Sequence, residues 1–126
     1  MKRFATAAIS LILCAASANA LTITDDPGGV IGDKTREVLN AFLAGEFVTI
    51  DGYCGSACTL YLINRNVCAT SRAILMFHAA SAPDGTAYLW KAYPENIKAY
   101  ITARGGLTKK PIIVSGKEVQ KLIPAC

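Results

Sequence analysis

The amino terminus of the chain is the feature that most limits what it can fold into. Residues 1–20 open with two basic residues, continue as an apolar run and end in the small-residue pattern Ala18-Asn19-Ala20. This order is typical of a secretory signal peptide cleaved after Ala20. The alternative, a membrane anchor, needs a longer apolar run. We therefore expect residues 21–126 to form one small exported domain that is periplasmic or secreted.

Charge and hydropathy narrow the classes of partner. The formal net charge of +4 falls to +2 once Lys2 and Arg3 are removed with the signal peptide. So small a positive balance predicts no nucleic-acid partner. No second long apolar run follows the first, so no stable membrane insertion is expected after cleavage. A lipid anchor on Cys14 is disfavoured because Leu13, rather than a small residue, precedes it. The short chain indicates a monomer or a small oligomer.

Four cysteines remain after the signal peptide: Cys54, Cys58, Cys68 and Cys126. An even number in a small exported domain predicts two disulfides. A metal site is the alternative, but the Cys-x3-Cys spacing is not the common Cys-x2-Cys and the chain has one histidine, so we expect neither metal nor cofactor. Three pairings are open. We favour Cys58–Cys68 with Cys54–Cys126, because a helix start and the next strand's end should lie on one side of the sheet.

The pattern of apolar residues predicts an α/β domain with at least a few parallel strands, because helices and strands alternate along the chain. A glycine-rich loop at 25–33 is followed by a predicted helix at 34–44, which Asp33 should cap and whose inward face should consist of Val38, Leu39, Phe42 and Leu43. The last predicted helix begins with a Ser115/Glu118 capping box. The elements expected between these two helices are a strand at 47–51, a buried helix at 56–64, strands at 66–69 and 73–78, a helical region from 86 divided at Pro94, and a strand at 111–114.

Three features can act together if the fold brings them close. They are the loop Pro27-Gly28-Gly29, Ser56 between a strand and a helix, and His78 at the end of a strand. A serine hydroxyl is a poor nucleophile until a neighbouring base takes its proton, and imidazole suits that task near neutral pH. Backbone N–H groups of the loop and of the residue after the serine can stabilise an oxyanion. The alternatives are a helix cap, a strand-end histidine and an ordinary turn.

The segments "PGGVIGD", "VTIDGYCGSACTLYL" and "ILMFHAA" resemble, in this order, the proteolytic subunit of the Clp protease and its relatives in the crotonase-like superfamily. The resemblance covers about residues 25–80 and is closest to short exported Clp-like proteins of bacteria. It implies a truncated crotonase-like spiral of β-β-α units, here stapled by disulfides. It also implies a serine peptidase or hydrolase acting on a peptide or acyl substrate. Ser56 matches the nucleophile, His78 the general base, and Gly29 and Ala57 the oxyanion hole.

The chain departs from that family in two respects. The segment 105–114, "GGLTKKPIIV", has no carboxylate where the family has the aspartate that orients the histidine. Loss of that group costs ~10⁴ in turnover in a Ser-His-Asp triad; Asp84 and Glu95 are the candidate substitutes. The chain also lacks segments used for ring assembly, so we expect no ATPase partner. Two hypotheses stay open: an active hydrolase and an inactive module that binds a peptide or acyl group.

Overall fold

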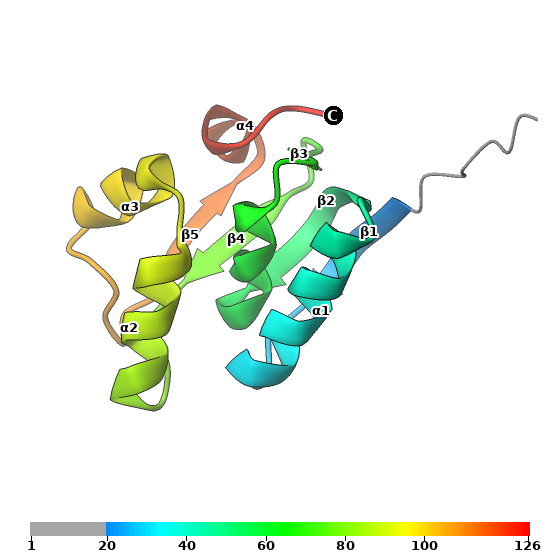
Figure 1. Ribbon diagram of the computed structural model, residues 1–126. Coiled ribbons are helices and arrows are strands. Elements are labelled where there is room, and N and C mark those ends of the chain that lie inside the picture. Colours follow the sequence, from blue (N-terminus) through cyan, green and yellow to red (C-terminus); the bar gives the residue numbers. More distant parts are fainter. Residues whose placement is uncertain (1–19) are drawn as a thin grey trace, which may run out of the picture.

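Five strands form one mixed sheet that organises the fold (Figure 1). The structure is a computed structural model that describes residues 20–126; apart from Ala20, the predicted signal peptide lies outside the described residues. The sheet order is β1-β2-β4-β5, and β3 pairs with the first part of β2 while β4 pairs with the second. The first four strands pair in parallel and β5 runs antiparallel to β4. The strands are β1 (Ala20–Asp26), β2 (Phe47–Gly55), β3 (Val67–Ala69), β4 (Ile74–Phe77) and β5 (Ile112–Ser115).

Helices follow the strands and cover the sheet. The green 3₁₀ helix η1 lies between α1 and α2 in Figure 1, and it contacts both of them. Its sequence, SACTLYLI, carries no charge, and the six residues at its centre are buried, as expected for an element that is apolar nearly all round. The helical elements are α1 (Ile31–Leu43), η1 (Ser56–Ile63), α2 (Pro83–Ala92), α3 (Glu95–Thr102), η2 (Gly116–Glu118) and α4 (Val119–Leu122). The predicted α/β class with parallel strands is thus confirmed.

The first strand and the first helix differ from the prediction. No strand was expected at 20–26, yet β1 pairs with β2 from Ala20 to Asp26. Helix α1 begins at Ile31 without a side-chain cap, so Asp33 lies in its first turn instead. The expected inward stripe was right at Val38 but wrong at its other three residues, because Leu39, Phe42 and Leu43 are 46%, 50% and 79% exposed. The buried face consists of Lys34, Val38 and Ala41, which are spaced about one turn apart and lie on the side toward the core.

The expected capping box near the carboxyl terminus does not form. Ser115 ends β5 and makes no side-chain cap hydrogen bond. Glu118 instead accepts a hydrogen bond from Lys121 Nζ at 2.8 Å. The short helix η2 separates Ser115 from α4, and its Gly116 N–H donates to Ala73 O at 2.9 Å. This backbone bond places the turn against the chain before β4. Ser115 stands at the start of η2 and Glu118 at the start of α4, so the two residues do not share one helix start.

Two disulfides join the four cysteines, as predicted, but the favoured pairing was wrong. Cys54 pairs with Cys58 and Cys68 pairs with Cys126. The tight first turn of η1 brings Cys58 back to within 5.3 Å of Cys54 between Cα atoms. The carboxyl terminus runs beside β3, where Cys126 N–H donates to Ala69 O at 3.1 Å, and so reaches Cys68. Both bonds are compatible with an extracellular or periplasmic protein, because disulfides persist in oxidising compartments.

Among residues 20–126, no helix is both long enough and apolar enough to cross a membrane.

Candidate active site

The glycine loop, Ser56 and His78 meet at one edge of the sheet because each follows a parallel strand. The register pairs Asp26 of β1 with Cys54 of β2, and Gly55 of β2 with Met76 of β4. The glycine loop leaves β1 directly after Asp26, Ser56 follows β2 directly, and His78 follows β4 directly. The carboxyl edge of parallel strands is where open α/β sheets place ligands. The three features are therefore brought together by strand register rather than by closeness in the sequence.

Ser56 occupies an unusual turn between β2 and η1. Its φ of +54° makes it the one residue other than glycine with a positive φ between residues 20 and 126. Such a conformation is rare and is found where surrounding structure holds it. The cap position belongs to Gly55, and the Ser56 hydroxyl makes no hydrogen bond within the described part of the chain. Helix capping by Ser56, the alternative reading of this residue, therefore does not occur.

The disulfide between Cys54 and Cys58 brackets this turn, and both cysteines are fully buried. Inside the turn, the Thr59 hydroxyl donates to Ser56 O at 2.6 Å. The Thr59 hydroxyl also lies 2.6 Å from the hydroxyl of Tyr93. Burial raises the pKa of Tyr93 to about 12, although the hydrogen bond to Thr59 opposes that shift. The Tyr93 ring packs edge-on against Phe77, the last residue of β4. The serine turn is thus held by the disulfide and by the hydrogen bonds of Thr59.

His78 is half-buried, and the two residues after it are anchored by hydrogen bonds. Ala79 N–H donates to Thr108 O at 2.8 Å, and Ala80 N–H donates to Thr86 Oγ1 at 3.0 Å. These two hydrogen bonds hold the backbone directly after His78 in place. Sequence reasoning missed this role of Thr86 as the acceptor for the Ala80 N–H. A small hydroxyl residue in the first turns of a helix was the only sequence signal for it.

Gly28 packs directly on the serine turn. A Cβ atom at Gly28 would lie 2.8 Å from Ala57 N and 2.9 Å from Ser56 Cβ, and the residue has a φ of +106°. Gly29, with a φ of +95°, has open space where its Cβ would be. The first glycine is therefore needed for close approach, and the second faces free volume.

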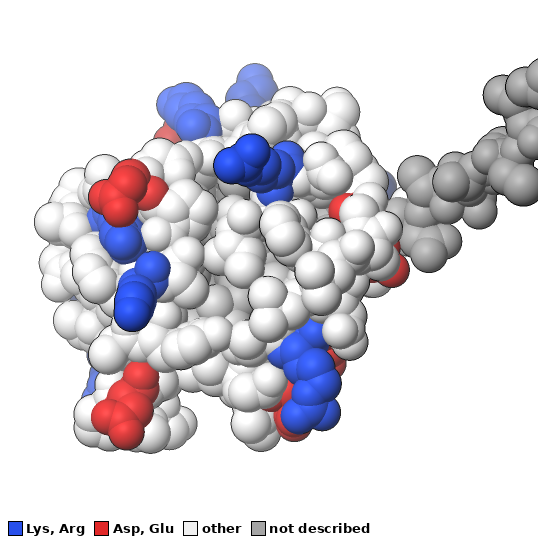
Figure 2. Space-filling model, viewed as in Figure 1, with Lys and Arg blue, Asp and Glu red and all other residues white. Residues whose placement is uncertain are grey.

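One cleft of about 510 Å³ holds three of the four predicted site residues. Ser56, His78 and Gly29 all line it, and in Figure 2 it forms the notch at the lower edge between the starts of α1 and α2. Ala57 does not line it and is fully buried beneath Gly28. His78 is the one titratable group in the lining. The remaining lining residues, which sequence reasoning did not name, are small or apolar: Val30, Ile31, Gly32, Ala80, Ser81, Ala82 and Gly85.

The structure does not bring either candidate carboxylate to His78. Asp84 is exposed in the first turn of α2 and does not line the cleft. Glu95 lies in α3, where it pairs with Lys98 at 3.0 Å. Between residues 20 and 126, no carboxylate oxygen lies within 4.0 Å of a His78 ring nitrogen. The Thr108 carbonyl reaches the chain beside His78, but the hydroxyl of Thr108 is used by Lys110.

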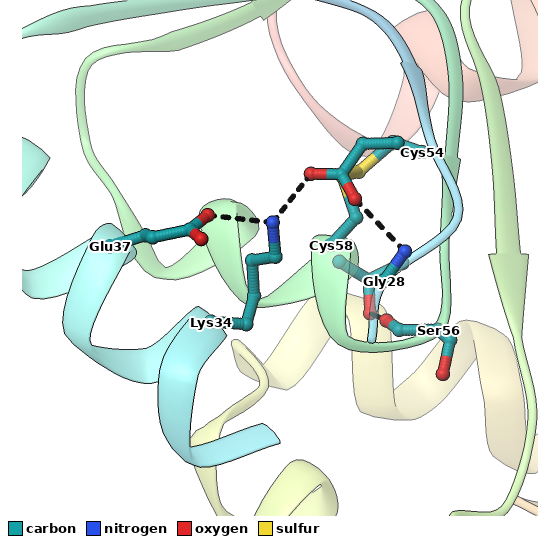
Figure 3. Close-up of polar contacts among 8 residues, drawn as sticks. Gly28, Lys34, Glu37, Cys54, Ser56 and Cys58 are labelled. Carbon is teal, nitrogen blue, oxygen red and sulfur yellow. Dashed lines mark hydrogen bonds and ion pairs between the residues drawn. A yellow bond between two sulfur atoms is a disulfide. The ribbon is translucent and has the colours of Figure 1, made fainter. Parts of the chain in front are cut away.

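A charged network that sequence reasoning missed lies behind the glycine loop (Figure 3). Lys34, only 7% exposed, places its Nζ 2.8 Å from Asp26 Oδ2 and 2.7 Å from Glu37 Oε2. Asp26 Oδ1 in turn accepts the Gly28 N–H at 2.9 Å. Burial lowers the pKa of Lys34, but the hydrogen bonds to Asp26 and Glu37 outweigh it and raise that pKa overall. An Asp two residues before Gly28 is a known turn signal and would have been the clue.

All four cysteines within residues 20–126 are in disulfides, and no cluster of three His, Cys, Asp or Glu side chains there can hold a metal ion. A comparison with protein-family models finds no match to the sequence. A comparison with curated proteins likewise finds no match.

Proposed function

We propose that the mature chain is an exported serine hydrolase, of peptidase type and Clp-like descent, with a truncated crotonase-like fold. The observation that carries the proposal is the shared cleft. Ser56 and His78 follow neighbouring parallel strands and open on the same space as Gly29. The Ser56 hydroxyl is not used for helix capping, and its turn is held in a rare backbone conformation. Strained serine turns between a strand and a helix expose nucleophiles in other hydrolases.

In the proposed reaction, Ser56 Oγ attacks the carbonyl carbon of an ester or peptide bond while His78 accepts its proton. The Gly29 N–H stabilises the oxygen that becomes negative, and the Ala57 N–H joins it in the family pattern. His78 then returns the proton to the leaving group, and water releases the acyl group from Ser56 by the same steps in reverse. Apart from Ser56 and His78, the cleft is lined by small or apolar residues, which favours a small or apolar group beside the scissile bond.

The test is covalent labelling of the purified, oxidised mature protein with a fluorophosphonate probe, followed by mapping of the labelled peptide. The wild type should be labelled at Ser56 and the Ser56→Ala variant should not. His78→Ala should label about 10²–10⁴-fold more slowly, because general-base catalysis contributes that factor. Ser81→Ala is the matched control, since Ser81 is an exposed serine of the same cleft. It should label as fast as the wild type.

Two outcomes would overturn the hydrolase proposal. One is labelling that persists in Ser56→Ala, and the other is a folded wild type that takes no label between pH 6 and 9. The second outcome would favour the alternative, an inactive module that binds a peptide or acyl ligand. The specific observation behind that alternative is the lack of a carboxylate beside His78 within residues 20–126. Without an orienting group the imidazole is not held in the tautomer that accepts the serine proton.

A further inference from the structure

The glycine loop is closed at its base by charged residues that neither line the cleft nor belong to the predicted site. Asp26 is the last residue of β1 and Lys34 is in the first turns of α1. Their side chains meet at 2.8 Å across the four loop residues 27–30. Lys34 N–H also donates to Val30 O at 3.0 Å, so the loop is pinned on its helical side as well. In Figure 3 the contacts run from Glu37 through Lys34 to Gly28, and Ser56 lies beside Gly28.

The loop itself has a conformation that needs outside support. Gly28 and Gly29 are consecutive residues with φ of +106° and +95°. Glycine adopts such angles easily but also leaves them easily, because it has the largest conformational freedom of any residue. The Asp26 carboxylate restrains Gly28 directly by accepting its N–H at 2.9 Å. Lys34 holds the other oxygen of that carboxylate and so fixes its direction. The restraint on Gly28 therefore depends on Lys34.

A buried lysine is a costly way to stabilise a fold. Lysine is almost never buried unless it is paired, and replacing a buried ion pair by apolar residues is often neutral or stabilising. Lys34 is 7% exposed, pairs with two carboxylates and has the Tyr61 ring 5.9 Å from its Nζ. Its position is better explained by geometry than by stability. The carboxylate that it orients is the one that holds the loop against the serine turn.

We propose that Asp26, Lys34 and Glu37 form a clasp that fixes the conformation of Gly28 and Gly29 and through it sets the reactivity of Ser56. The second half of this proposal rests on the hydrolase function, whereas the first half does not. These are positioning residues: Asp26 holds the Gly28 N–H, Lys34 orients Asp26, and Glu37 holds Lys34. Gly29, which lines the cleft, then keeps a constant position relative to Ser56. Misplacement of such a donor by about 1 Å can cost 10²-fold in rate.

The test compares Lys34→Met with Lys34→Arg in two measurements: the rate of fluorophosphonate labelling, and the hydrogen exchange of individual backbone amides by NMR. Lys34→Met should label about 10-fold more slowly or worse. It should also speed exchange at Gly28 about 10-fold while the amides of the β2–β4 ladder keep their rates. Lys34→Arg should restore most of both. Lys98→Met is the matched control, because Lys98 pairs with Glu95 at 3.0 Å in α3, away from the loop. It should change neither measurement.

Asp26→Asn and Asp26→Ala separate the two contacts of the carboxylate. Asparagine keeps an acceptor for the Gly28 N–H and loses the ion pair, so it should speed exchange at Gly28 less than alanine does. Unchanged exchange at Gly28 in Lys34→Met overturns the clasp, whether or not the wild type is labelled. Faster exchange with an unchanged labelling rate overturns the link to Ser56. A wild type that is never labelled rejects the hydrolase function alone, and exchange at Gly28 still decides whether the clasp holds the loop.

Discussion

Gly28 and Ser56 meet at one point of the backbone, where neither position accepts an arbitrary residue. Gly28 has a left-handed φ and no room for a Cβ atom, because Ala57 N and Gly55 O would each lie 2.8 Å away. Ser56 adopts a positive φ itself, and the disulfide and Thr59 hold the turn around it. The packing of Gly28, the disulfide and the Thr59 hydrogen bond together fix the position of the glycine loop relative to Ser56. The charged clasp adds the restraint that the glycines themselves cannot supply.

The two glycines provide a matched prediction at this scale. Gly29→Ala should cost about 1–2 kcal/mol of unfolding free energy, because a positive φ is strained for alanine but its Cβ meets open space. Gly28→Ala has the same strain and also collides with backbone atoms, so it should cost about 3 kcal/mol or more. Urea denaturation of the oxidised mature proteins measures both. Equal costs for the two variants would contradict the close packing of Gly28 on the serine turn.

At the scale of elements, η1 joins the site to the helical layer. It starts with the serine turn and packs against both α1 and α2. Tyr93 is the first residue after α2, and its hydroxyl lies 2.6 Å from the hydroxyl of Thr59. Because the Thr59 hydroxyl donates to Ser56 O, the Tyr93 hydroxyl donates to Thr59. The position of α2 is thus tied by a buried hydrogen bond to the carbonyl of Ser56.

Burial of Tyr93 predicts a pH dependence of stability above pH 10. Tyr93 ionises near pH 10 in the unfolded chain but near 12 in the folded protein, because burial raises its pKa. Between these values the unfolded state has lost a proton that the folded state keeps, so stability falls by about 1.4 kcal/mol per pH unit. Tyr93→Phe removes this term. Urea denaturation between pH 8 and 11 should show wild type losing stability faster than Tyr93→Phe; parallel loss would refute the assignment.

At the scale of the whole molecule, the two disulfides do different work. Cys68–Cys126 closes 58 residues of chain and ties the carboxyl terminus to β3, whereas Cys54–Cys58 closes only the serine turn. Constraint of the unfolded chain grows with the length of the closed loop. The long-range bond should therefore contribute more to stability, and the local bond more to the geometry around Ser56.

Double alanine variants separate these two effects. Removing Cys68–Cys126 should cost about 4 kcal/mol of unfolding free energy, against about 2 kcal/mol for Cys54–Cys58, from the loop-entropy relation. The order should reverse for fluorophosphonate labelling, where loss of Cys54–Cys58 should slow the reaction of Ser56 more. Chemical denaturation and labelling rates check the two orders. If one variant were worse in both measurements, the division of roles would be wrong.

Short sequence patterns predicted much of this fold. A strand was predicted from the β-branched run before Ser56, and a buried helix from the apolar run after it. Both form, and a loop with two positive-φ glycines follows β1 where the glycine-rich loop was expected. The sequence patterns also named Ser56, His78 and Gly29, which line one cleft. The pattern of apolar residues predicts these segments because each is apolar enough to be buried in the core. It missed β1, an edge strand whose residues are mostly exposed or half-buried.

Long-range contacts could not be read from local patterns. The disulfide pairing depended on the path of the carboxyl terminus beside β3, and the inward face of α1 depended on which side met η1. The Asp26–Lys34 contact depended on how β1 and α1 enclose the loop. Each is set by strand register and packing between elements, which are properties of the assembled chain. The residues needed for a serine site were thus apparent from their order, while the contacts that hold them in place arose from the fold.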